Sequence, residues 1–416
     1  MPPSRLEPEE DGAENRWLSR PFGVREIRIL GFRSARALAF APGPLCALVG
    51  EASVGKSNVL TAIWRLLNPG APVPVAADAT ADGPGVIRLE ATLADGDKIT
   101  LEVEPPGPAR RVGPSVPVLF LGGEHRTGSL VTRSGDLAGV ARHADELLAV
   151  ALSGRGTGGS AAAPAALVAA IEACCRAAIQ GLVLLIEEPE LYLRPQAQRY
   201  LYRLLRELAQ AGNQVIYATH APAFLNVGRL EELALVEHRR GQGTTILQPQ
   251  PLPTAEGFRA VNEVDAERGE LFLARAVLLV EGRTEKLVFP FVFQRLGHDA
   301  DREAISIVEC GGKPNLPLFA QICDAIGVPY VVVHDRDAPA GREPIQAERA
   351  VNAAIASIAG PERTVVLTPD FEAAAGLHGH SHKPERAWQS FSAIEPGDIP
   401  EPLAEAVRRV LAAARD

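Results

Sequence analysis

Residues 278–285 read Leu-Leu-Val-Glu-Gly-Arg-Thr-Glu, and residues 334–337 read His-Asp-Arg-Asp. Each segment closes an apolar run that stops in carboxylates, which is typical of a buried parallel strand ending at the carboxyl edge of a sheet. Glu281, Asp335 and Asp337 would meet at that edge and offer the oxygen ligands that a hard divalent cation prefers. The two segments therefore predict an α/β fold with an acidic site at one sheet edge.

The composition is that of a globular protein with more than one domain. A chain of 416 residues with 46% hydrophobic and 22% charged residues favours two domains. No apolar run reaches the roughly 18 residues of a membrane span, so no membrane association is expected. The net charge of −9 argues against indiscriminate coating of nucleic acid, although local arginines can still contact phosphates. Five cysteines without CxxC spacing argue against a zinc site or disulfides and favour a reducing cytoplasm.

The pattern of strands, helices and turns predicts the following organisation. Residues 1–22 are acidic and polar, and we expect a disordered leader. Strands are expected at 24–29, 45–49, 182–186 and 214–218, with hairpins at 86–103 and 233–248. Residues 23–250 would form the first domain, 251–273 a linker and 274–400 a second domain of alternating strands and helices. A helix is expected at 401–416.

The first domain carries a complete phosphate-binding motif. Residues 50–57 match G-x-x-x-x-G-K-S between a predicted strand and a predicted helix. Backbone N–H groups at Gly50 and Gly55 would face phosphate oxygens, and the helix N-terminus would add its dipole. Lys56 would bridge the terminal phosphates and Ser57 would bind Mg²⁺. We expect Asn58, the next residue, to belong to the nucleotide-binding site as well.

A second strand, at 182–186, ends in Glu187 and Glu188. The first acid can position Mg²⁺ and the second can polarise the attacking water. The chain resembles the ABC-type ATPases of the SMC/RecF kind in three features. These are this strand, the E-P-E and x-L-x-P residues that follow it, and a later strand that ends in Thr-His. The resemblance implies that two ATPase heads sandwich ATP and that His220 senses the γ-phosphate. Residues 152–160 depart from the usual signature loop, and a plain glycine-rich loop remains an alternative. Residues 68–125 contain no glutamine for a Q-loop, so ATP acting mainly as a switch also stays open.

The second domain resembles the Toprim domain in its V-E-G segment at 280–282 and its D-x-D at 335–337. An ABC-type P-loop ATPase domain followed by a smaller Toprim domain with a Rossmann-like parallel sheet resembles the OLD (overcoming lysogenization defect) family, over roughly residues 24–390. The resemblance implies Glu281 as acid/base or metal ligand, Asp335 and Asp337 on Mg²⁺, and Glu285 on a second metal. It also implies a phosphate contact from the Gly-Gly-Lys loop at 311–313 and charge stabilisation by Lys383.

Two further groups of side chains are candidates for the same site. Asp370 and Glu372 follow the predicted strand at 364–367 and would add carboxylates to the metal site. His378, His380 and His382 alternate, which suggests either transition-metal binding or an exposed polar loop. Two-metal phosphodiester hydrolysis needs several carboxylates and a cationic group, and this set supplies both.

These features together predict an ATP-regulated, metal-dependent DNA endonuclease that acts in DNA defence, such as defence against phage, or in repair. It would use ATP and Mg²⁺, or Mn²⁺ at the nuclease site. The expected partner is DNA, with a homodimer or higher homo-oligomer formed through the ATPase domain, and a helicase partner is left open. The alternative is an ATP-gated DNA-binding or sensing module whose Toprim domain is a non-catalytic scaffold. A topoisomerase would need a domain with a tyrosine nucleophile, and a primase gives no reason for the ATPase motifs.

Overall fold

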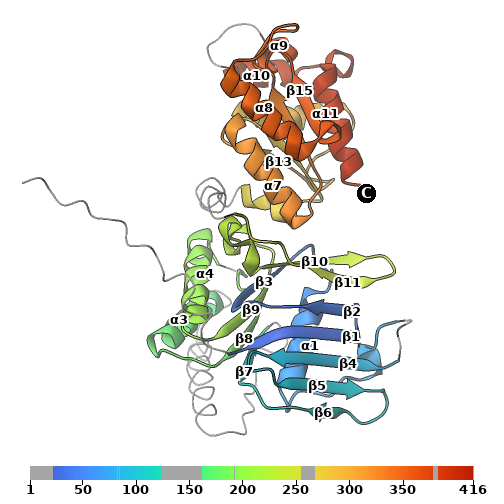
Figure 1. Ribbon diagram of the computed structural model, residues 1–416, viewed down its shortest axis with the longest axis vertical. Coiled ribbons are helices and arrows are strands. Elements are labelled where there is room, and N and C mark those ends of the chain that lie inside the picture. Colours follow the sequence, from blue (N-terminus) through green and yellow to red (C-terminus); the bar gives the residue numbers. More distant parts are fainter. Residues whose placement is uncertain are drawn as a thin grey trace, which may run out of the picture. The chain divides into compact units, whose positions relative to one another are not determined.

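The computed structural model describes residues 22–81, 83, 85–122, 162–191, 193–253, 268–377 and 383–415. The chain forms two compact units, one of Met1–Phe224 with Glu232–Ile246 and one of Leu225–Glu231 with Leu247–Asp416. Each unit is built on its own sheet with helices on both faces (Figure 1), which confirms the predicted α/β fold. Within the described residues, no helix has the length and apolar character that crossing a membrane requires.

The first unit contains, in the described part of the chain, an eleven-stranded sheet in the order β6-β5-β4-β1-β2-β11-β10-β3-β9-β8-β7. The strands are β1 (Val24–Phe32), β2 (Ala35–Phe40), β3 (Leu45–Val49), β4 (Ile87–Leu93), β5 (Lys98–Val103), β6 (Arg110–Val112), β7 (Val118–Leu121), β8 (Val183–Glu187), β9 (Gln214–Thr219), β10 (Leu233–Arg239) and β11 (Gly243–Leu247). The helices are α1 (Lys56–Leu67), α3 (Ala162–Arg176) and α4 (Pro195–Gln210).

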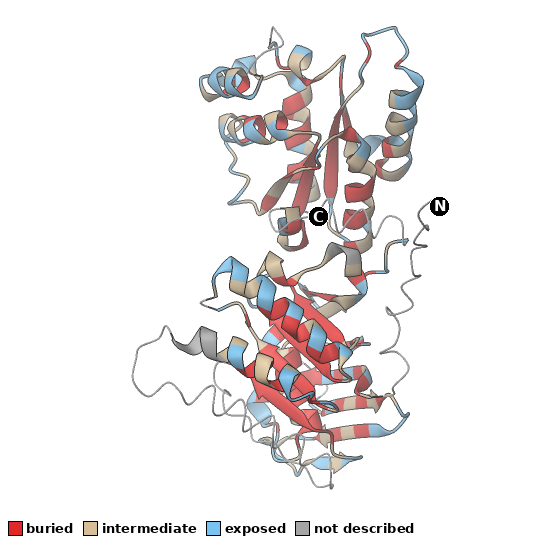
Figure 2. Ribbon diagram, turned by 90° about the vertical axis from the view of Figure 1, so that its left-hand side faces the viewer, coloured by how far each residue is buried: buried red, intermediate tan, exposed pale blue. Residues whose placement is uncertain are grey.

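This sheet has an antiparallel half and a parallel half. Strands β1, β2, β4, β5 and β6 pair antiparallel, whereas β10, β3, β9, β8 and β7 pair parallel. The parallel strands β3 and β9 are buried at every residue, because helices cover both faces there (Figure 2). Strand β5 instead alternates between buried and less buried residues. The β10–β11 hairpin lies between the two halves and joins them, since β10 pairs with β3 and β11 with β2.

Gln214 fastens the first strand of the chain to the parallel half. Its Oε1 accepts the Val24 N–H at 2.8 Å, and its Nε2 donates to the carbonyls of Val24, Pro42 and Gly43 at 2.9–3.2 Å. The side chain is buried, so these bonds satisfy polar groups that have no access to water.

The second unit contains, among the described residues, a four-stranded parallel sheet in the order β13-β12-β14-β15. Helices α6, α10 and α11 share an apolar core with one face of this sheet, and α7 and α8 contact its strands as well. All four strands end at the same edge because they are parallel. The bounds are β12 (Ala276–Val280), β13 (Ile305–Glu309), β14 (Tyr330–Asp335), β15 (Thr364–Leu367), α6 (Arg283–Arg295), α7 (Leu316–Ile326), α8 (Gln346–Ala359), α9 (Phe371–Ala374), α10 (Lys383–Ser392) and α11 (Glu401–Ala413).

The second unit extends beyond the expected bounds at both ends. Residues 268–273, expected in the linker, form a short 3₁₀ helix with buried Leu271 and Phe272, which contacts β13. Helix α11 contributes Leu403, Val407 and Val410 to the core of the unit, so it is part of the domain and not an appendage. The apolar stripe of α11 explains this position, because an amphipathic helix buries that stripe against a sheet.

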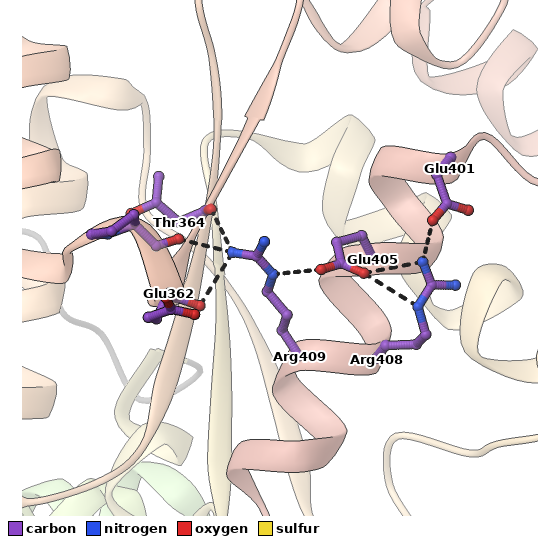
Figure 3. A network of polar contacts seen from close by, with 7 residues as sticks. Glu362, Thr364, Glu401, Glu405, Arg408 and Arg409 are labelled. Atoms are coloured by element: carbon purple, nitrogen blue, oxygen red, sulfur yellow. Dashed lines mark hydrogen bonds and ion pairs between the residues drawn. The ribbon is translucent and has the colours of Figure 1, made fainter.

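Two neighbouring arginines of α11 have different roles (Figure 3). Arg409 Nη1 donates to the carbonyls of Pro361, Glu362 and Thr364 at 2.9–3.2 Å, which ties the helix to the start of β15. Arg408 contacts only carboxylates of its own helix in the described residues, those of Glu401 and Glu405. Arg409 therefore connects two elements, whereas Arg408 does not.

Candidate functional site

The phosphate-binding loop lies between β3 and α1 and is packed tightly against other parts of its unit. Gly55 has a φ of +110°, and a Cβ atom there would lie 2.2 Å from Thr244 Oγ1 and 2.6 Å from Ser34 Oγ. A Cβ atom at Gly50 would lie 2.1 Å from the Val236 carbonyl oxygen. Only glycine permits these approaches, so the motif glycines let the loop backbone lie against the turn between β1 and β2 and against β10 and β11.

Lys56 is buried at the start of α1 and points back into the loop. Its Nζ donates to the carbonyls of Gly50 at 2.8 Å and Glu51 at 2.7 Å. Burial lowers the pKa of the Lys56 ammonium to about 8, although the charges of Glu188 and Glu190 oppose this. The lysine is therefore held where phosphate oxygens would meet the loop.

Glu188 and His220 follow the adjacent parallel strands β8 and β9. The His220 Nε2 lies 4.0 Å from Glu188 Oε1, and the His220 backbone N–H donates to Glu190 Oε1 at 2.6 Å. Burial lowers the pKa of His220, and the charge of Lys56 lowers it further. The lowered pKa favours the neutral imidazole, and a hydrogen bond with the Gly50 backbone ties the ring to the phosphate-binding loop. The structure thus brings Lys56, Glu188 and His220 together.

The other predicted nucleotide-binding residues lie around this group. Ser57 is exposed at the start of α1, and Glu187 lies at the end of β8, where a Cβ atom on Gly122 would stand 2.8 Å from its Oε2. Asn58 is engaged elsewhere: its Nδ2 donates to Ser34 Oγ at 2.7 Å, and its Oδ1 accepts from Arg33 at 3.3 Å. Asn58 thus holds the turn between β1 and β2 against the loop.

Sequence reasoning did not assign roles to Ser34, Thr244 or Glu190. Thr244 Oγ1 donates to the Val54 carbonyl and accepts from Ser34 Oγ, both at 2.8 Å, so the two hydroxyls brace the phosphate-binding loop. Their separation of 210 residues leaves no local signal in the sequence. Glu190 carries a signal, since it belongs to the quoted E-E-P-E segment, but its contact with the His220 backbone appears only in three dimensions.

The acidic site of the second unit lies at the carboxyl ends of β12 and β14, which are hydrogen-bonded neighbours. Glu281 follows β12, and its Oε1 accepts the backbone N–H of Asp335 at 2.6 Å. Glu285 lies in the first turn of α6, where its side chain is buried. Asp337 follows with a φ of +59°, and its N–H donates to the Pro369 carbonyl at 2.8 Å. The pairing of the two strands therefore brings the two predicted acidic segments together.

Burial and mutual repulsion raise the pKa values of these carboxylates. Burial raises the pKa of Glu281 to about 7 and that of Asp335 to about 8. It also raises the pKa of Glu285. Neighbouring carboxylates add to each shift, and Glu372 is among those acting on Glu285 and Asp335. A nearby cation would reverse this penalty, because opposite charge favours the ionised form.

The residues fit a divalent cation in their chemistry. The donor set is made of carboxylate oxygens, and Asp335 Oδ1 is buried with no hydrogen-bond partner among the described residues. A buried oxygen of this kind calls for a partner. Within the described residues, no three His, Cys, Asp or Glu side chains already form a group that could hold a metal ion.

The remaining predicted residues belong to α9, α10 and the segments beside them. Asp370 caps α9, with its Oδ1 accepting the Ala373 N–H at 2.8 Å, which gives that oxygen a structural role. Glu372 lies within α9. Lys383 is the first residue of α10, and its side chain lies outside the described part of the structure. The histidines at 378, 380 and 382 and the loop at 152–160 also lie outside the described residues.

The structure adds one residue beside the acidic site that the sequence did not suggest. Glu348, in the first turn of α8, has its Oε2 3.2 Å from Lys313 Nζ. Lys313 itself is buried and also pairs with Asp337. The sequence pointed to Lys313 through its Gly-Gly-Lys loop, but Glu348 lies 35 residues away and belongs to no motif.

Comparison with known proteins matches each unit to a known kind of domain. The family described as "Overcoming lysogenization defect protein-like, TOPRIM domain" matches residues 272–337, and "AAA domain, putative AbiEii toxin, Type IV TA system" matches 164–226. The OLD nuclease of Thermus scotoductus is 36% identical over 249 residues, which are 54% of this chain and 47% of that protein. The Old nuclease of Escherichia phage P2 is 29% identical, over 37% of this chain and 28% of that protein. The chain thus spans about half the length, or less, of these curated relatives.

Proposed function

Because the chain is an OLD-family protein that joins an ATPase domain to a Toprim domain, we propose that it is an ATP-regulated, divalent-metal-dependent DNA endonuclease. One observation carries the proposal: Glu281 and Asp335 are joined by a hydrogen bond at the ends of adjacent strands, where both have raised pKa values. Perturbed carboxylates that converge at the carboxyl edge of a parallel sheet are typical of a functional site.

The acidic residues would divide the work of phosphodiester hydrolysis. Divalent cations bound there would supply an activated water and charge stabilisation at the leaving oxygen. Asp335, with its unpartnered buried oxygen, and Asp337 are the expected ligands, and Glu285 and Glu372 are the next candidates. Glu281 is held in place by the Asp335 N–H and has a pKa near neutrality, which suits a group that accepts and returns a proton.

The ATPase unit would control this site. Gly50, Gly55, Lys56 and Ser57 would bind the phosphates and Mg²⁺ of ATP, with Glu187 as a further Mg²⁺ ligand. Glu188 would orient the attacking water, and the neutral His220 beside it would contact the γ-phosphate. We also propose self-association through this unit and action on DNA in defence or repair, with a helicase as a further candidate partner. We also place the protein in the cytoplasm, a reducing compartment in which its five cysteines would stay as thiols.

Plasmid nicking by the full chain in Mg²⁺ or Mn²⁺, with and without ATP, tests the proposal. Glu281→Ala and Asp335→Ala should each abolish nicking, whereas Glu362→Ala should leave it unchanged, because Glu362 is exposed at the start of β15. Identical purification of all variants controls for a contaminating nuclease. Undiminished cleavage by both acidic-site variants would refute the nuclease assignment.

A second function is favoured by a separate observation. Residues 152–160 depart from the usual signature loop, which favours a Toprim domain that serves an ATP-gated DNA-binding or sensing module as a non-catalytic scaffold. A scaffold need not bind divalent cations. Titration of the full chain with Mn²⁺ in the absence of ATP separates the two functions, since binding that depends on Asp335 supports the nuclease and no binding supports the scaffold.

A further inference from the structure

Lys313 occupies an unusual position for a surface-loop lysine. Its side chain is 6% exposed, whereas the carboxylates that it contacts, those of Asp337 and Glu348, are 36% and 34% exposed. The ammonium is therefore buried between two carboxylates that solvent can reach. Its charge also acts on Glu281 and His334, which places it beside the acidic site.

The backbone around Lys313 fixes this position. Gly311 and Gly312 have φ values of +74° and +118°, which favour glycine, and the Gly312 N–H donates to the Glu281 carbonyl at 2.8 Å. Asn315 Nδ2 donates to the Cys310 carbonyl at 3.0 Å. The loop is thus anchored to the strand end that carries Glu281, and its backbone conformation directs the lysine toward Asp337.

The two carboxylates that hold Lys313 differ in what they can do next. Asp337 belongs to the D-x-D segment and is an expected metal ligand, and its φ of +59° is costly for a residue other than glycine. The charge of Asp337 acts on Glu281 and Asp335, whereas Glu348 comes from α8 and contacts Lys313 from outside the D-x-D segment. A cation at the acidic site would therefore compete with Lys313 for Asp337 but not for Glu348.

We propose that Lys313 competes with the divalent cation for Asp337, and that Glu348 is the positioning residue that keeps Lys313 beside the site once the cation has displaced it. The inference rests on the proposed metal site and adds a residue that regulates cation binding there. In the displaced arrangement the ammonium keeps one carboxylate partner and gains a free donor, which can reach a phosphate oxygen by a charge-assisted hydrogen bond. Metal binding and phosphate binding would then be coupled through one side chain.

The competition predicts opposite effects for its two partners. Removing the charge of Lys313 frees Asp337, so Lys313→Gln should bind metal more tightly. Removing the charge of Glu348 leaves Lys313 with Asp337 as its only carboxylate partner among the described contacts, so Glu348→Gln should bind metal more weakly. A purely structural ion pair would give no such opposition, because breaking it from either side would disturb the site in the same direction.

Calorimetric titration of the full chain with MnCl₂, without ATP, measures these effects directly. We expect Lys313→Gln to tighten the Mn²⁺ Kd by about fivefold or more, as for other coupled ligands. Glu348→Gln should weaken it by about threefold, because partly exposed ion pairs couple modestly. Lys98→Gln and Glu343→Gln remove the same charges at exposed positions and should match the wild type. Lys313→Arg, which keeps the charge, should bind Mn²⁺ as the wild type does.

The outcomes separate this inference from the proposed function. If the wild type binds Mn²⁺ but Lys313→Gln binds it equally or less tightly, the competition is refuted. If Glu348→Gln binds Mn²⁺ like the wild type, the positioning role of Glu348 is refuted, and this arm remains decisive should Lys313→Gln fail to fold. If the wild type binds no Mn²⁺, the proposed metal site itself is wrong.

Discussion

Replacing Glu281 with glutamine should stabilise the metal-free second unit while removing its proposed chemistry. Burial and the neighbouring carboxylates raise the pKa of Glu281 from 4.5 to about 7. A folded-state pKa above the unfolded one means that the protonated carboxyl group favours folding. Its contribution is complete below pH 4.5 and is lost as the pH rises through 7. Glutamine cannot ionise, yet its Oε1 can still accept the Asp335 N–H.

The size of the effect follows from the pKa values. A tenfold change in a protonation equilibrium corresponds to about 1.4 kcal/mol, so the ionised Glu281 costs the folded state about 3 kcal/mol at pH 8 and under about 1 kcal/mol at pH 5. Between these pH values, the stability difference between Glu281→Gln and wild type should grow by about 2.5 kcal/mol in favour of the variant. Loss of the Glu281 charge also lowers the pKa of Asp335, on which Glu281 is the largest charge acting, and this adds to the stability of the variant at high pH.

Hydrogen exchange of the β12 and β14 amides in the full chain, with EDTA present, measures the opening free energy of the second unit alone. Glu362→Gln, an exposed substitution of the same type, should keep the pH dependence of the wild type. A hundredfold excess of Mn²⁺ over the Kd stabilises the binding-competent wild type by about 2.7 kcal/mol, which should nearly cancel the advantage of the variant at pH 8. The reasoning is wrong if Glu281→Gln loses as much protection between pH 5 and pH 8 as the wild type does.

Three further predictions concern the rest of the chain. Lys56→Ala should weaken ATP binding by at least about tenfold in calorimetry, because the lysine provides charge at the terminal phosphates. The same variant should bind Mn²⁺ in the absence of ATP as the wild type does. Equal loss of ATP binding and Mn²⁺ binding would contradict separate sites. Arg409→Ala should lower the stability of the second unit by about 1–3 kcal/mol, because three carbonyls lose their donor. Arg408→Ala should lower it by under about 1 kcal/mol. Equal losses in thermal unfolding would refute the distinction. Gln214→Leu should lower the stability of the first unit by about 2–4 kcal/mol, since it leaves buried backbone groups of Val24 unpaired, and an unchanged melting temperature would rule this out.

The sequence predicts those parts of the fold whose physical cause is local. The buried strands at 45–49, 182–186 and 214–218 are continuous apolar runs, because parallel strands covered on both faces need them. The glycines of the phosphate-binding motif can likewise be recognised in the sequence, since their φ values and close packing exclude other residues. By contrast, the short edge strand β6 and the strand β7 lie in or beside a stretch rich in proline, glycine and aspartate and were not predicted.

The parts of the candidate sites that escaped prediction are contacts between distant segments. Glu348 contacts Lys313 from helix α8, and Thr244 contacts Ser34 from the neighbouring strand β11. In neither case does spacing along the chain give a signal. Asp370 shows the reverse problem: its position after a strand suggested a metal ligand, but the same position makes it the N-cap of α9. Residue type and strand-end position thus locate a site, whereas the partners within it depend on the tertiary fold.

The β10–β11 hairpin has a consequence for the synthesis of the protein. Its two strands join the antiparallel half of the large sheet to the parallel half, and they are the last strands of that sheet to be translated. A nascent chain that ends before residue 233 therefore exposes the open edges of β2 and β3, which are sites for misassembly with other chains. On the ribosome, the ATPase unit should close only as residues 233–247 emerge, so its folding is completed just before that of the Toprim unit begins.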